Sequence, residues 1–414
     1  MASWDRHYRR FRWGSIATAA VLLLTMACGE TDDSLPEDHQ EIPEKSEEPE
    51  EPEESEESEE SEESEESEES EESEESEESE ESEESEESEE SEESEESEES
   101  EESEESEESE ESEESEESEE SEEPQQGEWT EESVGSVEYY LYTPGAEPAS
   151  SSQRPLMLSL HGCSQTRTDL RDHGNWEAAA ESYGMAVVLP AVPNGGVYTG
   201  CWDYYGEDHS RSNRHNGPLL ELVEHLLDDD ALAIDADRVF VSGLSSGGSQ
   251  AMLLGCLAPE VFSAVAINAG PTVGTGAFEV SFVATDEPTA ADLCQALAGD
   301  LDAYFDTQIA SMIYGGNDLA VAQEYNHLNA DVMASIYGVT QSEATELGDL
   351  EGQNTEGTRW SYNDDQGPRI SLIENEQVDH QWPAGAGSGG NFITAYSIDY
   401  PQYLTTFIMA NHRR

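Results

Sequence analysis

The pentapeptide Gly243-Leu-Ser-Ser-Gly247 constrains the fold of this chain more than any other segment. It follows the apolar run 238–242 and precedes a helix-like run that continues through Leu254. A G-x-S-x-G motif between a strand and a helix is typical of a nucleophile elbow, a turn so sharp that glycines must flank the serine. The pattern therefore predicts a nucleophilic Ser245, and the alternative is a plain glycine-rich turn.

A serine hydroxyl needs a base that takes its proton and a carboxylate that orients the base. Where such an elbow is present, the acid and then the histidine follow the serine along the chain. Asp318 follows the strand-like run 309–314 in a Gly-Gly-Asn-Asp loop. His380 lies in a loop after the strand-like run 369–373. We predict that both belong to a catalytic triad with Ser245, the alternatives being an ordinary Asn-Asp turn and a structural histidine.

An oxyanion hole requires a second backbone donor, which is supplied by the loop after an early central strand. The run Leu156–Leu160 has the character of such a strand, and His-Gly-Cys-Ser-Gln follows it. We assign the two donors to the amides of Cys163 and Ser246. The alternative for the His-Gly-Cys segment is a metal site, but no CxxC or HxxxH partner lies nearby, so neither a metal nor another cofactor is expected.

Four ordered motifs resemble those of the polyhydroxybutyrate depolymerase-type esterases, a family that also includes feruloyl and acetylxylan esterases. They are His161-Gly-Cys-Ser-Gln165, Cys201-Trp202, the elbow segment 238–248 and Asp379-His-Gln-Trp-Pro383. The resemblance runs from about Val137 to the C-terminus. It implies a non-permuted α/β-hydrolase with Ser245, Asp318 and His380 as its triad and Cys163 at the oxyanion hole. The chain departs from the family pattern at Asp379 and Ala384, where glycines are usual.

Substrate selection depends on the loops around Ser245. Trp202, Tyr204 and Trp382 are predicted to contact the substrate, and the alternative for these aromatic residues is core packing. The first choice of substrate is a short-chain polyhydroxyalkanoate, and the second is a feruloyl or acetylxylan ester. An alternative from another class of function is a surface lipoprotein. In that hypothesis the acidic repeat binds cations or a partner, and the hydrolase domain serves as a scaffold.

The N-terminus carries the features of a secretory signal. Four arginines precede a short apolar core over 14–26, which is too short for a comfortable transmembrane helix. The sequence Leu-Thr-Met-Ala-Cys28 resembles a bacterial lipoprotein box, although its leucine lies one place further from the cysteine than usual. We predict a signal peptide over 1–27, lipidation of Cys28 and a location in the bacterial envelope, at the outer membrane or cell surface. Ordinary signal-peptidase cleavage is the alternative.

The chain has five cysteines, an odd number for a secreted protein. With Cys28 used as the lipid anchor, four remain, and they can form two disulfides in an oxidising compartment. Three pairings are possible. We favour Cys163 with Cys201, which would tie the oxyanion loop to the Cys-Trp loop, and Cys256 with Cys294. Free buried thiols are the alternative.

After a tether over 28–45, residues 46–123 consist of Ser-Glu-Glu triplets, two of which have proline in place of serine. The 52 glutamates of this repeat supply most of the net charge of −86. Because the repeat offers almost no apolar side chains and its like charges repel, we expect a disordered, extended spacer. Binding of divalent cations is the alternative, although regular calcium loops need asparagine and glycine at defined places.

Residues 128–414 are expected to form one α/β domain. Seven strand-like runs alternate with helix-like stretches, which predicts a mostly parallel sheet covered on both faces. The runs are 137–142, 156–160, 185–189, 239–242, 264–268, 309–314 and 370–373. Outside residues 1–123 the chain has 41 acidic residues and ten arginines, without lysine. Nucleic acid is therefore excluded as a partner, because no basic patch can hold its phosphates.

Overall fold

The computed structural model describes residues 126–148, 152–342 and 344–414. The predicted signal peptide, the tether with Cys28 and the Ser-Glu-Glu repeat lie outside the described residues.

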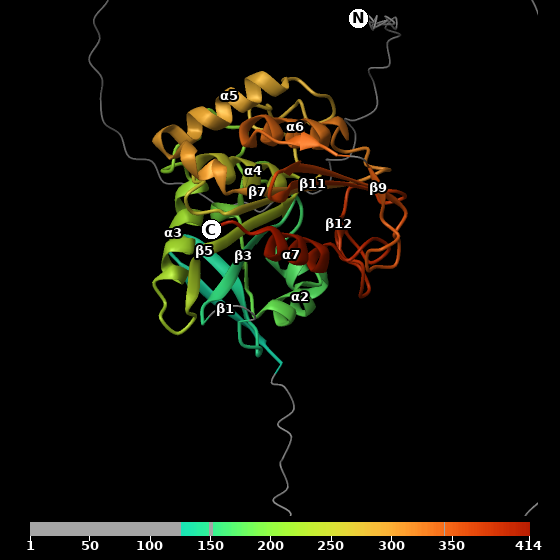
Figure 1. The fold of residues 1–414 in the computed structure, drawn as a ribbon. Coiled ribbons are helices and arrows are strands. Elements are labelled where there is room, and N and C mark those ends of the chain that lie inside the picture. The colour runs from blue at the N-terminus through green and yellow to red at the C-terminus, as the bar shows by residue number, and fades with distance from the viewer. Residues whose placement is uncertain (1–125, 149–151, 343) are drawn as a thin grey trace, which may run out of the picture. The chain divides into compact units, whose positions relative to one another are not determined.

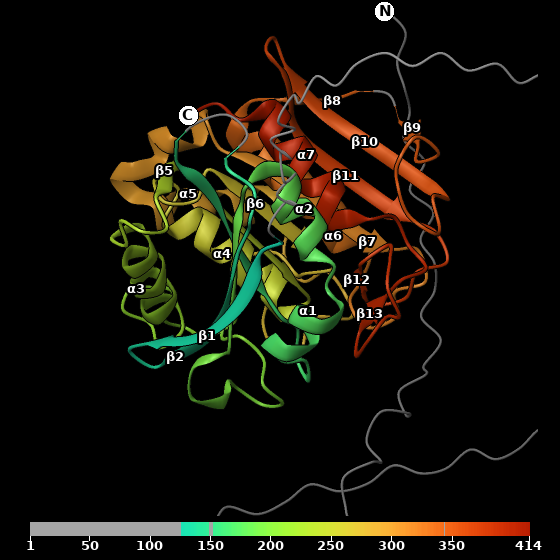
Figure 2. The same ribbon diagram turned by 90° about the horizontal axis from the view of Figure 1, so that it is seen from below.

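One sheet organises the described domain. Its strands run in the order β1-β2-β4-β3-β5-β6-β7-β11-β10-β8, and β9 pairs with β10. The strands are β1 (Glu128–Val134), β2 (Val137–Thr143), β3 (Arg154–Leu160), β4 (Ala186–Pro190), β5 (Ile234–Leu244), β6 (Ala264–Asn268), β7 (Ile309–Gly315), β8 (Thr340–Gln341), β9 (Thr345–Glu346), β10 (Gly357–Asp364) and β11 (Gly367–Asn375). The six strands from β4 to β11 in this order are parallel, and antiparallel strands flank them. Figure 2 shows β1 and β2 at one edge of the sheet and the long β10–β11 hairpin at the other.

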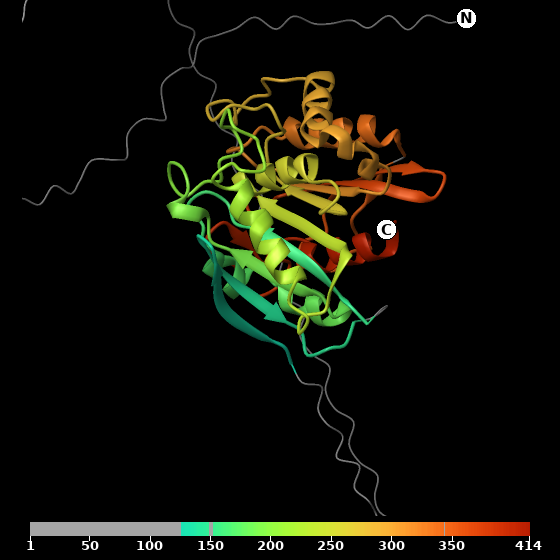
Figure 3. The ribbon, with the colours of Figure 1, turned by 90° about the vertical axis from the view of Figure 1, so that its left-hand side faces the viewer.

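Helices cover both faces of this sheet. They are α1 (Arg167–His173), α2 (Trp176–Tyr183), α3 (Asn216–Leu227), α4 (Ser246–Leu257), α5 (Glu287–Ala298), α6 (Glu324–Tyr337) and α7 (Tyr400–Asn411), with short 3₁₀ turns at Pro193–Gly195 (η1) and Gly299–Asp306 (η2). Helices α4, α5 and α6 pack together on one face, and α2 and α7 pack together on the other (Figure 1). A side view shows the orange α5 and α6 above the strands (Figure 3). The predicted mostly parallel sheet with two helical layers is confirmed.

Burial on two faces explains the composition of the central strands. The residues of β4, β6 and β7 are buried throughout, and so is the second half of β5. Parallel strands covered on both sides read as continuous apolar runs because neither face meets water. Helix α4 is likewise buried along its whole length, between β5, β6 and α5. The helix that follows Ser245 therefore lies at the centre of the core and forms a rigid support for that serine.

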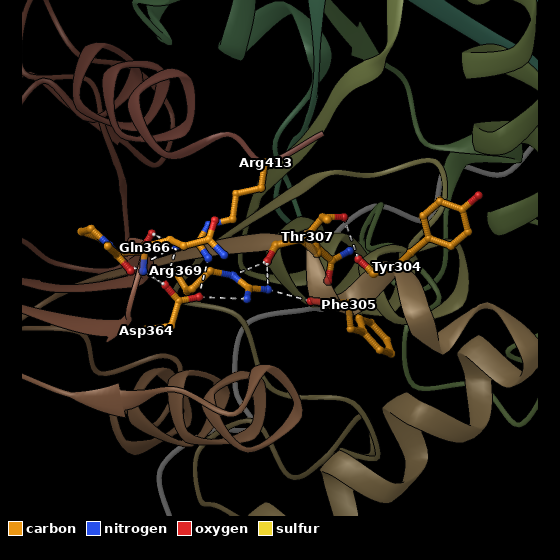
Figure 4. Close-up of polar contacts among 10 residues, drawn as sticks. Tyr304, Phe305, Thr307, Asp364, Gln366, Arg369 and Arg413 are labelled. Atoms are coloured by element: carbon orange, nitrogen blue, oxygen red, sulfur yellow. Dashed lines mark hydrogen bonds and ion pairs between the residues drawn. The ribbon is translucent and has the colours of Figure 1, made fainter.

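A buried arginine closes the end of the β10–β11 hairpin (Figure 4). The guanidinium of Arg369 donates to the carbonyl of Phe305 at 2.6 Å and to that of Gln308 at 2.7 Å. It also pairs with Asp364 at 3.5 Å, and the same carboxylate accepts from Arg413 near the C-terminus. These hydrogen bonds hold the pKa of Asp364 down at about 2, with the bond from Arg413 as the main cause. The network ties the hairpin, η2 and the chain end together at the edge of the sheet remote from Ser245.

Candidate active site

Ser245 lies on a strained turn between β5 and α4. Its φ and ψ are 57° and −120°, a region that non-glycine residues rarely adopt. Its amide donates to the carbonyl of Asn268 on β6 at 2.8 Å, which fixes the turn over the sheet. A Cβ on Gly243 would lie 2.3 Å from the backbone of Gly247, and a Cβ on Gly247 would lie 2.5 Å from the carbonyl of Leu160. The two glycines are required because no side chain fits at these approaches, as expected for a nucleophile elbow.

Asp318 and His380 form a hydrogen-bonded pair. Asp318 Oδ2 lies 2.8 Å from His380 Nδ1, and the carboxylate is buried. Its other oxygen accepts from the amides of Ala320 at 2.9 Å and Val321 at 3.0 Å. The carboxylate is therefore held from both sides. An Nδ1–H that donates to Asp318 leaves the other ring nitrogen of His380 as an acceptor.

Backbone contacts connect the two loops that carry this pair. The amide of Asn317 donates to the carbonyl of Val378 at 2.9 Å. Gly315, at the end of β7, lies so close to the histidine loop that a Cβ there would be 2.1 Å from the carbonyl of Val378. On the other side, the side-chain amide of Asn268 donates to the carbonyl of Gln381 at 3.2 Å. Because Asn268 also binds the amide of Ser245, one residue positions both the elbow and the histidine loop.

The loop after β3 lies beside the elbow. An added Cβ on Gly162 would be 3.4 Å from Ser245 Cβ. The side chain of Gln165 accepts from the amide of Gly162 at 2.7 Å and donates to the carbonyl of Asn391 at 2.7 Å. Among the hydrogen bonds of the described residues, the amides of Cys163 and Ser246 have no acceptor. The two predicted donors are thus free next to Ser245. Gln165 braces this loop, a role that its place in the sequence motif did not reveal.

Two disulfides join the four cysteines of the described domain, in the pairing favoured from the sequence. Cys163 is bonded to Cys201, and Cys256 of α4 is bonded to Cys294 of α5. The first disulfide connects the loop after β3 with the segment that follows η1. The second joins two helices on one face of the sheet.

A pocket of about 310 Å³ opens above these residues. Ser245, Ser246, His380 and Cys163 line it, together with apolar residues from four loops. Its aromatic lining comes from Tyr198, Tyr204, Tyr205 and Phe392. Among the described residues that line the pocket there is no Asp, Glu, Lys or Arg. The pocket therefore suits an uncharged, largely apolar ligand.

Two of the predicted substrate contacts are wrong for this pocket. Trp202 and Trp382 are fully buried and do not line it. The indole of Trp202 donates to the carbonyl of His161 at 2.9 Å, and that of Trp382 donates to the carbonyl of Gly174 at 3.0 Å. Each large ring anchors a loop in the core, and its single N–H group is used in a hydrogen bond to a backbone carbonyl. Tyr204 does line the pocket, as predicted.

A buried histidine fixes the segment that carries these tyrosines. His215 Nδ1 accepts from the amide of Asp203 at 2.8 Å, and the Asp203 carboxylate pairs with Arg214 at 3.0 Å. Burial lowers the pKa of His215 to about 4, with Asp203 opposing the shift and Arg214 adding to it. At neutral pH His215 is therefore uncharged, and its Nδ1 can accept the hydrogen bond from the amide of Asp203.

Two kinds of feature are absent from the described part of the chain. It contains no group of three or more His, Cys, Asp or Glu side chains arranged to hold a metal ion. Across residues 126–148, 152–342 and 344–414, none of the helices combines the length and apolar character needed to span a membrane.

The fold is that of an α/β-hydrolase. It matches the solved structure of the acetyl xylan esterase from Aspergillus awamori with a TM-score of 0.50 at 17% identity, over 61% of this chain and 94% of that one. This likeness concerns the fold alone.

Sequence comparison relates part of the chain to one family of esterases. Residues 137–337 match the family described as esterase PHB depolymerase. The chain is 37% identical over 303 residues to a poly(3-hydroxybutyrate) depolymerase of Ralstonia pickettii, covering 70% of this chain and 61% of the relative. It is 25% identical to poly(3-hydroxyalkanoate) depolymerase C of Paucimonas lemoignei over 62% of this chain and 61% of that protein. The likeness to the esterase PHB depolymerase family thus concerns residues 137–337, and the chain spans about three fifths of the length of these two relatives.

Proposed function

We propose that the protein is a serine carboxylic-ester hydrolase. The observation that carries this proposal is the 2.8 Å contact between Asp318 and His380 at a pocket that Ser245 also lines. An acid that orients a histidine beside a serine on a sharp elbow is the arrangement used for acyl transfer. The free amides of Cys163 and Ser246 can stabilise the negative charge that develops on the carbonyl oxygen of the substrate.

The reaction follows from these positions. His380 takes the hydroxyl proton of Ser245 while Ser245 Oγ attacks the ester carbonyl carbon. The carbonyl oxygen becomes an oxyanion that accepts hydrogen bonds from the amides of Cys163 and Ser246. The imidazolium, stabilised by Asp318, gives its proton to the departing alcohol, and an acyl-enzyme remains. Water then repeats the sequence with His380 as base, which releases the acid and restores Ser245.

The substrate that we infer is a short-chain polyhydroxyalkanoate such as poly(3-hydroxybutyrate). The 37% identity to a poly(3-hydroxybutyrate) depolymerase supports it. The chemistry of the pocket supports it as well, because a polyester chain is uncharged along its length and the pocket lining has no ionised acid and no Arg or Lys. The second candidate is a feruloyl or acetylxylan ester, which is supported by 25% identity over 142 residues to acetylxylan esterase A of Aspergillus awamori.

We further propose that the enzyme acts outside the cell as a lipoprotein anchored at Cys28, with the Ser-Glu-Glu repeat as its spacer. The arginine-rich start, the short apolar core and the cysteine after Leu-Thr-Met-Ala support this location. A cation-binding or adhesive role of the repeat is the competing hypothesis, and it would leave hydrolysis dispensable.

The test compares the full chain with its Ser245→Ala variant. We expect hydrolysis of p-nitrophenyl butyrate by the wild-type protein and a loss of at least 10³-fold in the variant. Turnover of 3-hydroxybutyrate oligomers above that of methyl ferulate or acetylated xylan would select the polyester. A folded protein with both disulfides and no turnover of any of these esters would refute the esterase proposal. Globomycin-sensitive processing and labelling with a radioactive fatty acid would test Cys28.

A further inference from the structure

One buried side chain, that of Gln165, joins the loop after β3 to the segment that follows His380. Its Oε1 accepts from the amide of Gly162 at 2.7 Å. Its Nε2 donates to the carbonyls of Asn391 at 2.7 Å and Phe392 at 3.3 Å. Because one partner is an N–H and the other two are carbonyls, only this orientation of the side-chain amide satisfies all three contacts. Both ends of the Gln165 side chain are therefore in use.

On one side, Gln165 fixes the peptide unit that carries the predicted oxyanion donor. The carbonyl of Gly162 accepts from the backbone amide of Gln165 at 3.3 Å and lies 2.8 Å from His161 Nδ1. The bond between Gly162 and Cys163 is a trans peptide, in which the C=O and the following N–H point in opposite directions. The contacts of the Gly162 carbonyl therefore also set the direction of the N–H of Cys163.

On the other side, Gln165 reaches the segment of the predicted general base. The carbonyl of Phe392, which accepts from Gln165, also accepts from the amide of Trp382 at 2.8 Å. Trp382 begins β12 (Trp382–Pro383), two residues after His380, and β12 pairs with β13 (Ile393–Thr394). One backbone carbonyl thus connects Gln165 to the strand that directly follows the histidine loop.

Each of the two loops that meet at Gln165 contains a strained residue. The φ angle is 60° at Ser164 and 51° at Phe392, in the left-handed region that residues other than glycine rarely adopt. The amide of Ser164 donates to the carbonyl of Thr199 at 2.8 Å, and its carbonyl accepts from Asn391 Nδ2 at 2.7 Å. Such a conformation persists only where its surroundings hold it. The bonds from Gln165 and Asn391 do so for both loops, and their loss would let both turns relax.

We propose that Gln165, assisted by Asn391, is a positioning residue that couples the oxyanion hole to the general base. It sets the spacing between the amide of Cys163 and the imidazole of His380. This inference rests on the proposed function and adds to it a residue that touches neither substrate nor nucleophile. In the transition state the oxyanion meets the amide while the histidine holds the proton, so both groups must be in place at once. Independent movement of the two loops therefore lowers kcat more than it raises KM.

The kinetic test uses Gln165→Glu in the full chain, which keeps the size of the side chain. A carboxylate can still accept from the amide of Gly162, but it has no N–H for the two carbonyls and repels them. On p-nitrophenyl butyrate we expect kcat to fall about 100-fold with KM changed by no more than about threefold.

Gln308→Glu is the matched control. Gln308 is also a buried glutamine, and its Nε2 likewise donates to two carbonyls, those of Gly255 at 3.1 Å and Phe262 at 2.8 Å. It directly precedes β7, whereas Asp318 follows that strand, so it is remote from the candidate site. We expect this variant to lower Tm and to leave kcat within about twofold of the wild-type value.

Hydrogen exchange measures the coupling without any turnover. In Gln165→Glu we expect backbone amides of both 161–166 and 379–393 to exchange about tenfold faster, and in Gln308→Glu we expect neither segment to change. Asn391→Ala removes a single exposed hydrogen bond between the same two loops and carries the test if Gln165→Glu does not fold. In that variant we expect the same paired change in exchange and a fall in kcat of about tenfold.

The outcomes separate this inference from the proposed function. Faster exchange in only one of the two segments would overturn the inference. Equal losses of kcat in Gln165→Glu and Gln308→Glu would do the same, and so would an effect confined to KM. A wild-type protein that cleaves no ester, while its variants show the paired change in exchange, would refute the proposed function and leave the coupling of the two loops standing.

Discussion

The carboxylate of Asp318 meets three donors, and His380 is the one among them that comes from a distant loop. Both of its oxygens are committed, one to the imidazole and one to the two backbone amides. The geometry of this pair makes the tautomer of His380 depend on Asp318.

Replacing Asp318 by asparagine should therefore impair catalysis far more than folding. An amide that presents its N–H to His380 favours the wrong tautomer, so we expect kcat to fall about 10³- to 10⁴-fold with little change in KM. Steady-state kinetics on p-nitrophenyl butyrate measure this effect. Asp379→Asn is the control, because that acid is adjacent to the histidine but exposed. Similar losses in the two variants would contradict the assignment.

Gly315→Ala should disrupt the site through the backbone. The added methyl group would overlap the carbonyls of Val378 and Asp379, so the loops of Asp318 and His380 must separate. We expect a loss of activity of at least 100-fold and a lower Tm. Gly348→Ala provides the comparison, because its added Cβ meets no atom within 4 Å and its backbone is not left-handed. If Gly315→Ala retained full activity, the loops would not need this close approach.

The two disulfides allow a test in which position alone differs. Each closes a loop with a sequence separation of 38, so the chain-entropy model gives each the same contribution, about 4 kcal/mol. Replacing Cys163 and Cys201 by serine should reduce both Tm and kcat, because it releases the loop with the free amide of residue 163. Replacing Cys256 and Cys294 should reduce Tm with kcat nearly unchanged. Equal effects on kcat would show that the first disulfide has no special role in the site.

Stability should depend on His215 at mildly acidic pH. Its folded pKa of about 4 lies below the ordinary value of 6.5, so the unfolded chain takes up a proton that the folded domain does not. The stabilisation is complete above about pH 6.5, declines as the pH falls toward 4, and is lost below that value. Asp364, whose pKa is about 2, acts in a lower window, from its ordinary value of 3.8 downward.

Thermal unfolding curves from pH 7 to pH 4 measure this dependence. In His215→Asn, an uncharged amide oxygen remains to accept the amide of Asp203, and the fall in Tm over this range should become shallower. An identical pH dependence in the two proteins would indicate that other groups dominate.

The strands with continuous apolar runs could be predicted from the sequence, because burial on both faces leaves a strong signal. Strands β1 and β10 could not. Strand β1 is mostly exposed and rich in glutamate, and β10 is half-buried along most of its length, so neither has an apolar run or a clear alternation. Both are stabilised by pairing with a neighbouring strand, which is a tertiary effect that local composition does not reveal.

The candidate site, like the fold, could be predicted from the sequence only in part. Strand ends and chain order led to Asp318 and His380, and the structure brings the two together, while their catalytic role stays a prediction. The sequence could not separate Trp202 and Trp382, which anchor loops, from Tyr198 and Phe392, which line the pocket. All four aromatic residues lie near loops without periodicity, and the direction of each ring is decided by the hydrogen bonds and packing of the folded chain.

The segment from Cys201 to His215 is fixed at both of its ends. The disulfide to Cys163 holds its start, and the bond from the Asp203 amide to His215 Nδ1 joins its first turn to its last residue. Its interior, which includes Tyr204 and Tyr205, faces the pocket from between these two attachments. The interior of this segment can therefore be replaced, by selection or design, to change which acyl groups enter the pocket. Ser245 and the loop beside it would keep their positions.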